Sequence, residues 1–129
     1  MSIIRPSALL AISLFAAGYL KADQRTLWVA SVVAHGAGTA FDAYASYHRG
    51  PYEANSFLAD PNGQFGNRAL GVKIGIFAGV SALEYALIRW TSHRDSALAH
   101  ALTKTFTVVN FSGGAAYLAS GTRNLTIIK

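Results

Sequence analysis

The chain has 129 residues, which is enough for one domain and too few for two of ordinary size. Hydrophobic residues reach 52% and charged residues only 13%, a balance that favours contact with lipid over a highly solvated surface. The net charge of +5 comes from scattered basic residues, which excludes a clustered nucleic-acid-binding patch, and zero cysteines exclude disulfides and thiolate metal sites.

The first apolar segment covers residues 3–20, and after Pro6 its only polar side chains are Ser7 and Ser13. Its length is close to the minimum for a helix that crosses a bilayer. A signal peptide is the alternative, with Arg5 as its basic start and residues 8–20 as its apolar core. We expect a retained transmembrane helix over residues 3–20.

The second segment, residues 26–47, is rich in Ala, Val and Gly but carries a regular series of polar residues. They recur at steps of three or four and share one helical face: Ser31, His35, Thr39, Asp42, Ser46 and Arg49. Because a charged side chain facing lipid costs about 2.5–3.5 kcal/mol on insertion scales, we expect this face to point into a helix bundle. Small residues also recur every four positions, which predicts close helix packing at Ala30, Ala34 and Gly38.

A long link at residues 48–68 separates the second segment from the third. It contains Pro51, Pro61 and three glycines, so we expect an irregular surface loop. The links at residues 21–25 and 91–96, between the first and second segments and between the third and fourth, are much shorter. We therefore expect two antiparallel helical hairpins, one formed by residues 3–20 and 26–47 and the other by residues 69–90 and 97–120.

The third segment, residues 69–90, contains two charged residues, Lys73 and Glu84. Their spacing of eleven places them on one helical face but about 16 Å apart, so each needs a partner from another helix or must reach the interface. A small-residue pattern that brings helices together in lipid is formed by Gly71, Gly75 and Gly79. The fourth segment, residues 97–120, has a weakly polar, small-residue face that includes Thr103, Thr107, Asn110, Gly114, Tyr117 and Gly121.

The chain contains no specific catalytic or nucleotide-binding motif. Asp42 is either a structural carboxylate, bonded to the loop or paired with Arg49, or part of a proton relay, metal site or substrate site. His35 is a weak candidate for cofactor binding, and it fits an interhelical hydrogen bond better than a ligand. His93 and His100 are weak candidates for a pigment or metal, because no carboxylate has matching spacing. We assign no metal site, and a bound lipid, or a pigment from a partner complex, stays open.

A distinctive pattern joins the second and third segments: an Asp, then Gly-x-x-Glu-x-Asn, then a Lys in the next helix. Its residues are Asp42, Ser46, Gly50, Glu53, Asn55 and Lys73. Over residues 35–80 the pattern resembles an uncharacterised family of small bacterial membrane proteins that are predicted to have four helices. The chain has Ser56 where the family usually has Pro. The resemblance implies an architecture and no particular reaction.

Glu53 and Asn55 follow the second segment closely enough for the loop to fold back toward Asp42, with Lys73 nearby. Two carboxylates, an amide and an amine could form a closed network that pins the loop. They could equally form an interfacial site for chemistry or transport.

These features predict one all-α domain over residues 1–129, an integral membrane bundle of four transmembrane helices in the bacterial cytoplasmic (inner) membrane. Equal numbers of basic residues at the two ends leave the orientation undetermined. Trp28 and Trp90 lie near helix ends, as in an aromatic belt or in ordinary packing.

The predicted function is that of a non-catalytic accessory or scaffold subunit that packs against a larger membrane-protein complex. Its predicted partners are the lipid bilayer and other membrane-protein subunits, and nucleic acid is excluded. One alternative is a membrane-embedded enzyme or transport element that uses Asp42, Glu53, Asn55 and Lys73. Another is a soluble four-helix bundle, which would require the apolar segments to be exposed to water.

Overall fold

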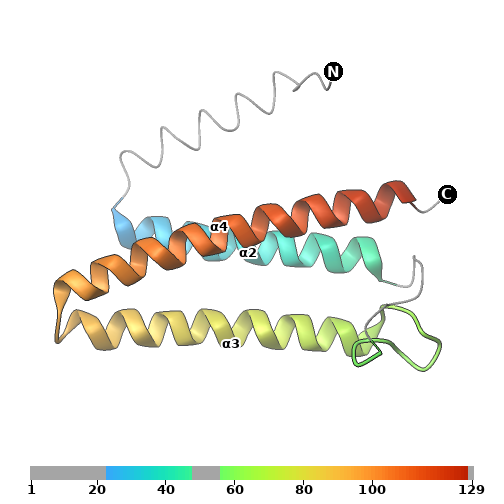
Figure 1. Ribbon diagram of the computed structural model, residues 1–129, viewed down its shortest axis with the longest axis horizontal. Coiled ribbons are helices and arrows are strands. Elements are labelled where there is room, and N and C mark those ends of the chain that lie inside the picture. The colour runs from blue at the N-terminus through green and yellow to red at the C-terminus, as the bar shows by residue number, and fades with distance from the viewer. Residues whose placement is uncertain (1–22, 48–55, 128–129) are drawn as a thin grey trace, which may run out of the picture.

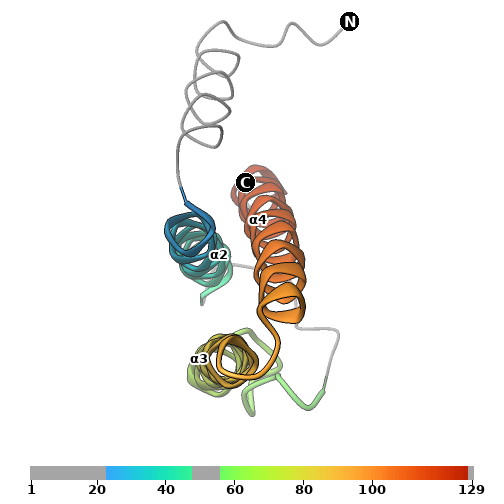
Figure 2. The same ribbon diagram turned by 90° about the vertical axis from the view of Figure 1, so that its left-hand side faces the viewer.

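The computed structural model describes residues 23–47 and 56–127, which form three helices (Figure 1). These are α2 (Gln24–Ser46), α3 (Asn67–Ser92) and α4 (Ser96–Ile127). Helices α2 and α4 run in the same direction, and α3 runs antiparallel to both. Viewed end-on, the three helices occupy the corners of a triangle (Figure 2). The most extensive packing is between α2 and α4, and the least is between α2 and α3.

The predicted four-helix transmembrane bundle is wrong. Within the described residues there are three helices, and only α3 is long and apolar enough to cross a membrane. Helices α2 and α4 are long enough to cross a membrane, but polar residues recur along both and lower their hydropathy. Length alone therefore does not identify a membrane-spanning helix. Helix α4 also continues to Ile127, beyond its predicted end at residue 120. The predicted helix over residues 3–20 lies outside the described part of the chain.

Aspartates cap the two parallel helices. The Asp23 carboxylate accepts a hydrogen bond from the Thr26 backbone N–H at 2.8 Å, at the start of α2. This N–H holds the pKa of Asp23 below its ordinary value of 3.8. At the start of α4, Asp95 accepts from the Leu98 N–H at 3.0 Å. Each cap satisfies a backbone donor that has no partner inside its helix.

The described end of the long loop packs against the bundle. Residues Ala59 and Phe65 form an antiparallel bridge around a turn, in which Gly63 adopts a φ of 77° that favours glycine. This turn buries Phe65 against Ala43 of α2 and Ala69 of α3. The loop therefore fills the space between these two helices beside the end of α2.

Burial in the described helices is the reverse of that in a soluble protein. None of the Leu, Ile or Val side chains that the structure describes is buried. The buried helix positions hold small or polar residues, while large apolar side chains cover the outside, including Val33, Ile74, Ile76, Leu83 and Val108. A soluble helical protein buries its large aliphatic residues and rarely exposes so much apolar surface. Such a surface is typical of helices that contact lipid or another apolar surface.

Candidate functional site

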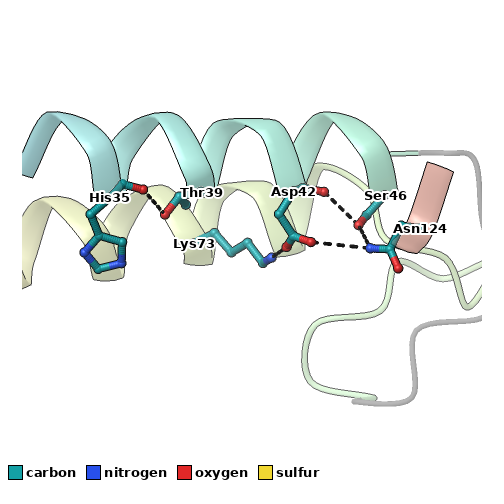
Figure 3. Close-up of polar contacts among 6 residues, drawn as sticks. All are labelled: His35, Thr39, Asp42, Ser46, Lys73 and Asn124. Carbon is teal, nitrogen blue, oxygen red and sulfur yellow. Dashed lines mark hydrogen bonds and ion pairs between the residues drawn. The ribbon is translucent and has the colours of Figure 1, made fainter. Parts of the chain in front are cut away.

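The first polar cluster lies between the end of α2, the start of α3 and the end of α4, and consists of Asp42, Ser46, Lys73 and Asn124 (Figure 3). Asp42 is only 3% exposed and forms an ion pair with the Lys73 ammonium. The Asn124 amide donates to the Ser46 hydroxyl at 2.8 Å and, at 3.4 Å, to the second Asp42 oxygen. We call this set the ion-pair cluster.

Aromatic rings surround the Lys73 ammonium of the ion-pair cluster. Its nitrogen lies 5.0 Å from the centre of the Tyr117 ring and 5.2 Å from that of Phe65. These distances are within the range of cation–π attraction. The charge of Lys73 is thus compensated both by the Asp42 carboxylate and by two ring faces, which offsets the cost of removing it from water.

The second polar cluster, the central network, joins all three helices through Trp28, His35, Glu84 and Asn110. Glu84 is 4% exposed, and one of its oxygens accepts from the Trp28 indole N–H at 2.9 Å and from the Asn110 amide at 2.8 Å. The Asn110 amide N–H donates a hydrogen bond to Glu84, so the Asn110 side-chain oxygen faces His35 Nδ1, at 2.9 Å. The Nδ1–H of His35 is therefore the donor of this hydrogen bond, and the Asn110 oxygen is its acceptor.

Ring contacts fix the orientation of His35 within the central network. Its ring stacks on Tyr117 of α4 with 5.8 Å between the centroids, and it meets the edge of Phe77 of α3 at 5.5 Å. Among the described residues, every buried side-chain nitrogen or oxygen has a hydrogen-bond partner. Both clusters are therefore closed polar networks, the arrangement that makes buried polar groups tolerable.

Small residues bring α2 and α4 into backbone contact. A Cβ atom added at Gly114 would lie 2.8 Å from the Ala34 carbonyl oxygen, and one added at Gly38 would collide with the Gly114 backbone. Gly113 of α4 lies against a side chain instead: a Cβ atom added there would lie 3.1 Å from the His35 ring. Of the small-residue positions predicted on α2, Ala34 and Gly38 thus lie against the α4 backbone, and the prediction for Ala30 stays untested.

The glycines of α3 are in a different situation. A Cβ atom added at Gly71, Gly75 or Gly79 would have nothing within 4 Å in the described part of the chain. Lys73 and Glu84 point into the bundle, and Gly75 is about 200° around the helix from Lys73 at 100° per residue. Ala82 and Ala86, at helical spacing from Gly75, are also exposed. Together these residues form an outward small-residue ridge: Gly71, Gly75, Gly79, Ala82 and Ala86.

The structure distributes the other candidate residues as follows. Asp42 and Lys73 come together, whereas Glu53 and Asn55 lie outside the described residues, as does Arg49. His93 and His100 lie at the opposite end of the bundle from the ion-pair cluster, where they line a cavity of about 610 Å³. Within the described ranges, no group of three potential metal-ligating side chains occurs.

Two members of the polar clusters were not identified from the sequence. Asn124 was missed because the fourth helix was expected to end at residue 120. Its signal is the spacing of two heptads from Asn110, which keeps both on one face. Trp28 was interpreted from its place near a helix end, and nothing in the sequence indicates that its N–H faces Glu84.

No family model, curated protein or solved structure matches this chain. The resemblance of residues 35–80 to a family of small bacterial membrane proteins stays a prediction. Its central residues Gly50, Glu53 and Asn55 lie outside the described part of the chain.

Proposed function

We propose that this protein is a small, non-catalytic accessory subunit, inserted in the bacterial cytoplasmic membrane through α3, that packs laterally against a larger membrane protein. The single observation that carries the proposal is the outward small-residue ridge on α3, the one helix among the described residues that is able to cross a membrane. Small residues let two helix backbones approach closely in lipid, where apolar contact alone provides little net attraction.

The α2–α4 interface supports this interpretation of the ridge. There, the same kind of small-residue spacing brings two backbones into contact, as the approach of Gly114 to Ala34 demonstrates. The ridge on α3 has equivalent chemistry and no neighbour within the described residues. Large apolar side chains flank it on both sides, with Ile74 on one and Ile76 and Leu83 on the other. A partner helix could lie along the ridge and contact these flanking side chains.

The apolar outer surface supports insertion in a membrane. In a bilayer, polar side chains are turned inward and satisfied within the protein, whereas large apolar side chains face lipid. The ion-pair cluster and the central network lie inside, and Val33, Val108 and Leu118 lie outside. Helices α2 and α4 shield each other's polar faces, and α3 provides the apolar length.

Chemistry or transport at Asp42 and Lys73 has less support. The two groups are paired with each other, and Asn124 and the Tyr117 ring complete their surroundings. A catalytic carboxylate or amine must be able to reach a substrate. Lys73 lines a cavity of about 360 Å³ between α2 and α3, but its ammonium is paired with Asp42, which suits a role in holding α3 against α2 better than one in catalysis.

Substitution on the ridge tests the proposal. The full chain and its Gly75→Val variant would each be isolated from native membranes in a mild detergent, and the accompanying proteins identified by mass spectrometry. We expect a defined membrane-protein partner with the wild type and its loss with Gly75→Val, because the added side chain separates the helix backbones.

The matched control is Ala119→Val, which places the same side chain on the exposed outer face of α4. It should retain the partner. Loss of the partner with both variants, or with neither, would contradict the assignment to the ridge. Alkaline carbonate extraction tests insertion independently: release of the wild-type chain from the membrane would contradict an integral location.

A further inference from the structure

A large cavity lies at the end of the bundle where α2 and α4 begin and α3 ends. Its volume is about 610 Å³, and all three helices line it. This is well within the size range of small-molecule sites. The ion-pair cluster and the ridge contribute no residue to its lining. It is therefore separate from the features that carry the proposed function.

The charged residues of the cavity lining are basic. Arg25 of α2 and Arg89 of α3 both line it, and no aspartate or glutamate does. Among the described residues, neither arginine forms a salt bridge. The acidic residues near the cavity are engaged elsewhere, Asp23 and Asp95 at helix N-termini and Glu84 with Trp28 and Asn110. Asp23 also has a coulombic interaction with Arg25. Guanidinium groups in this situation favour a phosphate or carboxylate ligand.

The remaining lining combines polar residues, among them Gln24, His93 and His100, with an apolar and aromatic part. Trp28 and Val29 of α2 and Tyr85 and Ile88 of α3 form walls beside the arginines. The Trp28 and Tyr85 rings lie near each other, with 6.3 Å between their centroids. A soluble anion would leave these walls without a partner. An amphiphile with an anionic head and an acyl chain would contact both parts of the cavity.

The position of the cavity at the end of α3 fits a site for a lipid headgroup. Just outside it, Trp90 and Arg94 of the α3 end form a cation–π contact with 4.6 Å between the guanidinium carbon and the ring centre. Tryptophan and basic residues at the end of an apolar helix mark the headgroup level of a bilayer. If α3 spans the membrane, as the proposed function holds, the arginines of the cavity lie where lipid phosphates are located.

We propose that this cavity binds one amphiphile whose phosphate headgroup carries a net negative charge, with the phosphate held by Arg25 and Arg89 and the apolar chain lying along Trp28, Val29 and Ile88. Basic pockets between membrane helices bind anionic headgroups by this combination of charge and apolar contact. The inference rests on the membrane insertion of the proposed function and on no property of the ridge.

Native mass spectrometry of the full chain in mild detergent tests the proposal. Phosphatidylglycerol, phosphatidylcholine and soluble glycerol phosphate would each be titrated. We expect one bound phosphatidylglycerol and weak binding of the other two. The Arg25→Gln/Arg89→Gln variant should bind phosphatidylglycerol about 30-fold more weakly, since each basic residue near an anionic surface changes the affinity by about five- to sixfold.

Two further variants provide controls. Arg25→Lys/Arg89→Lys keeps the charge and should retain most of the binding. Arg68→Gln/Arg123→Gln removes two exposed charges from the other end of the bundle and should leave the affinity unchanged. If this distant pair weakened binding equally, general surface charge rather than the cavity would be responsible.

Each ligand also has an outcome that overturns the proposal. Equal binding of phosphatidylcholine, whose phosphate is balanced by a choline cation, would exclude selection of a net negative headgroup, and equal binding of glycerol phosphate would exclude a role for the apolar walls. Either result would leave membrane insertion intact if the chain resists carbonate extraction. Release of the chain by carbonate would instead contradict the proposed function, independently of the lipid titration.

Discussion

Two interfaces of this small bundle are built on different principles. Between α2 and α4, Gly38, Gly113 and Gly114 allow the backbones and the His35 ring to meet with no space for a further methyl group. Between α2 and α3, packing is sparse and polar contacts connect the helices at two levels, through Lys73 to Asp42 and through Trp28 to Glu84. The first interface combines close backbone contact with hydrogen bonds such as that of His35 with Asn110, whereas the second relies more on a few polar contacts.

The difference has a consequence for each kind of residue. A close backbone contact tolerates no added volume, because neither carbonyl oxygen can move without displacing its helix. A contact made by buried charges tolerates added volume but not the loss of a partner, because the remaining charge keeps its desolvation cost. Helix α3 should therefore be sensitive at Lys73 and insensitive along its outward ridge.

Removal of the Lys73 charge should have the largest effect. In Lys73→Met the Asp42 carboxylate stays buried without its cation, and among the described side chains only the long hydrogen bond from Asn124 compensates it. We expect a loss of about 3–5 kcal/mol in the free energy of unfolding. Chemical unfolding in detergent, followed by circular dichroism, measures this loss.

The double variant Asp42→Leu/Lys73→Met is its control. It removes both charges, and replacing a whole buried pair with apolar residues is often neutral or stabilising. It should therefore be more stable than Lys73→Met alone. A double variant as unstable as the single one would indicate that shape, and not charge, holds α3 against α2.

An added side chain at Gly114 should have the next largest effect. In Gly114→Val the new Cβ atom would lie 2.8 Å from the Ala34 carbonyl oxygen and 3.1 Å from the His35 Cα atom. Overpacking of this kind typically costs about 1–3 kcal/mol. Thermal unfolding in detergent should show a lower midpoint for this variant.

The same substitution on α3 sharpens the comparison. Gly75→Val has open space around its Cβ position, so the isolated protein should unfold at nearly the wild-type temperature. If Gly75→Val were as destabilising as Gly114→Val, the ridge would be packed against part of this chain and would not be available to a partner.

Periodicity predicted which residues share a face, because this depends only on the geometry of one helix. The inward positions of Lys73 and Glu84 agree with their spacing of eleven residues, and the polar face of α2 contains both His35 and Asp42. Their actual partners did not follow from spacing. Tertiary packing alone brings Glu84 to Trp28 and Asn110.

The choice of interface could not be predicted for a related reason. The small-residue series around Gly38 and that around Gly75 look equivalent in sequence, yet only the first contacts α4. Small side chains permit close approach without specifying a partner. The four-helix transmembrane prediction was wrong because the lengths of α2 and α4 were suitable while their polar faces reduced their hydropathy below that of α3.

The helix starts extend the contrast between the parallel pair and α3, with the smallest expected effect. Asp23 caps α2, whereas Gly66 precedes α3 and offers no side-chain cap. Because the Thr26 N–H lowers the pKa of Asp23 in the folded state, the charged cap stabilises the protein fully above its unfolded pKa, near 3.8. This stabilisation is lost as the pH falls through the lower folded pKa.

The unfolding midpoint of Asp23→Asn, which keeps an acceptor without the charge, should therefore be slightly below that of the wild type at neutral pH and approach it below about pH 4. Asp23→Ser, a second neutral cap, should behave in the same way, and a wild-type advantage that does not change with pH would exclude the charge as its cause.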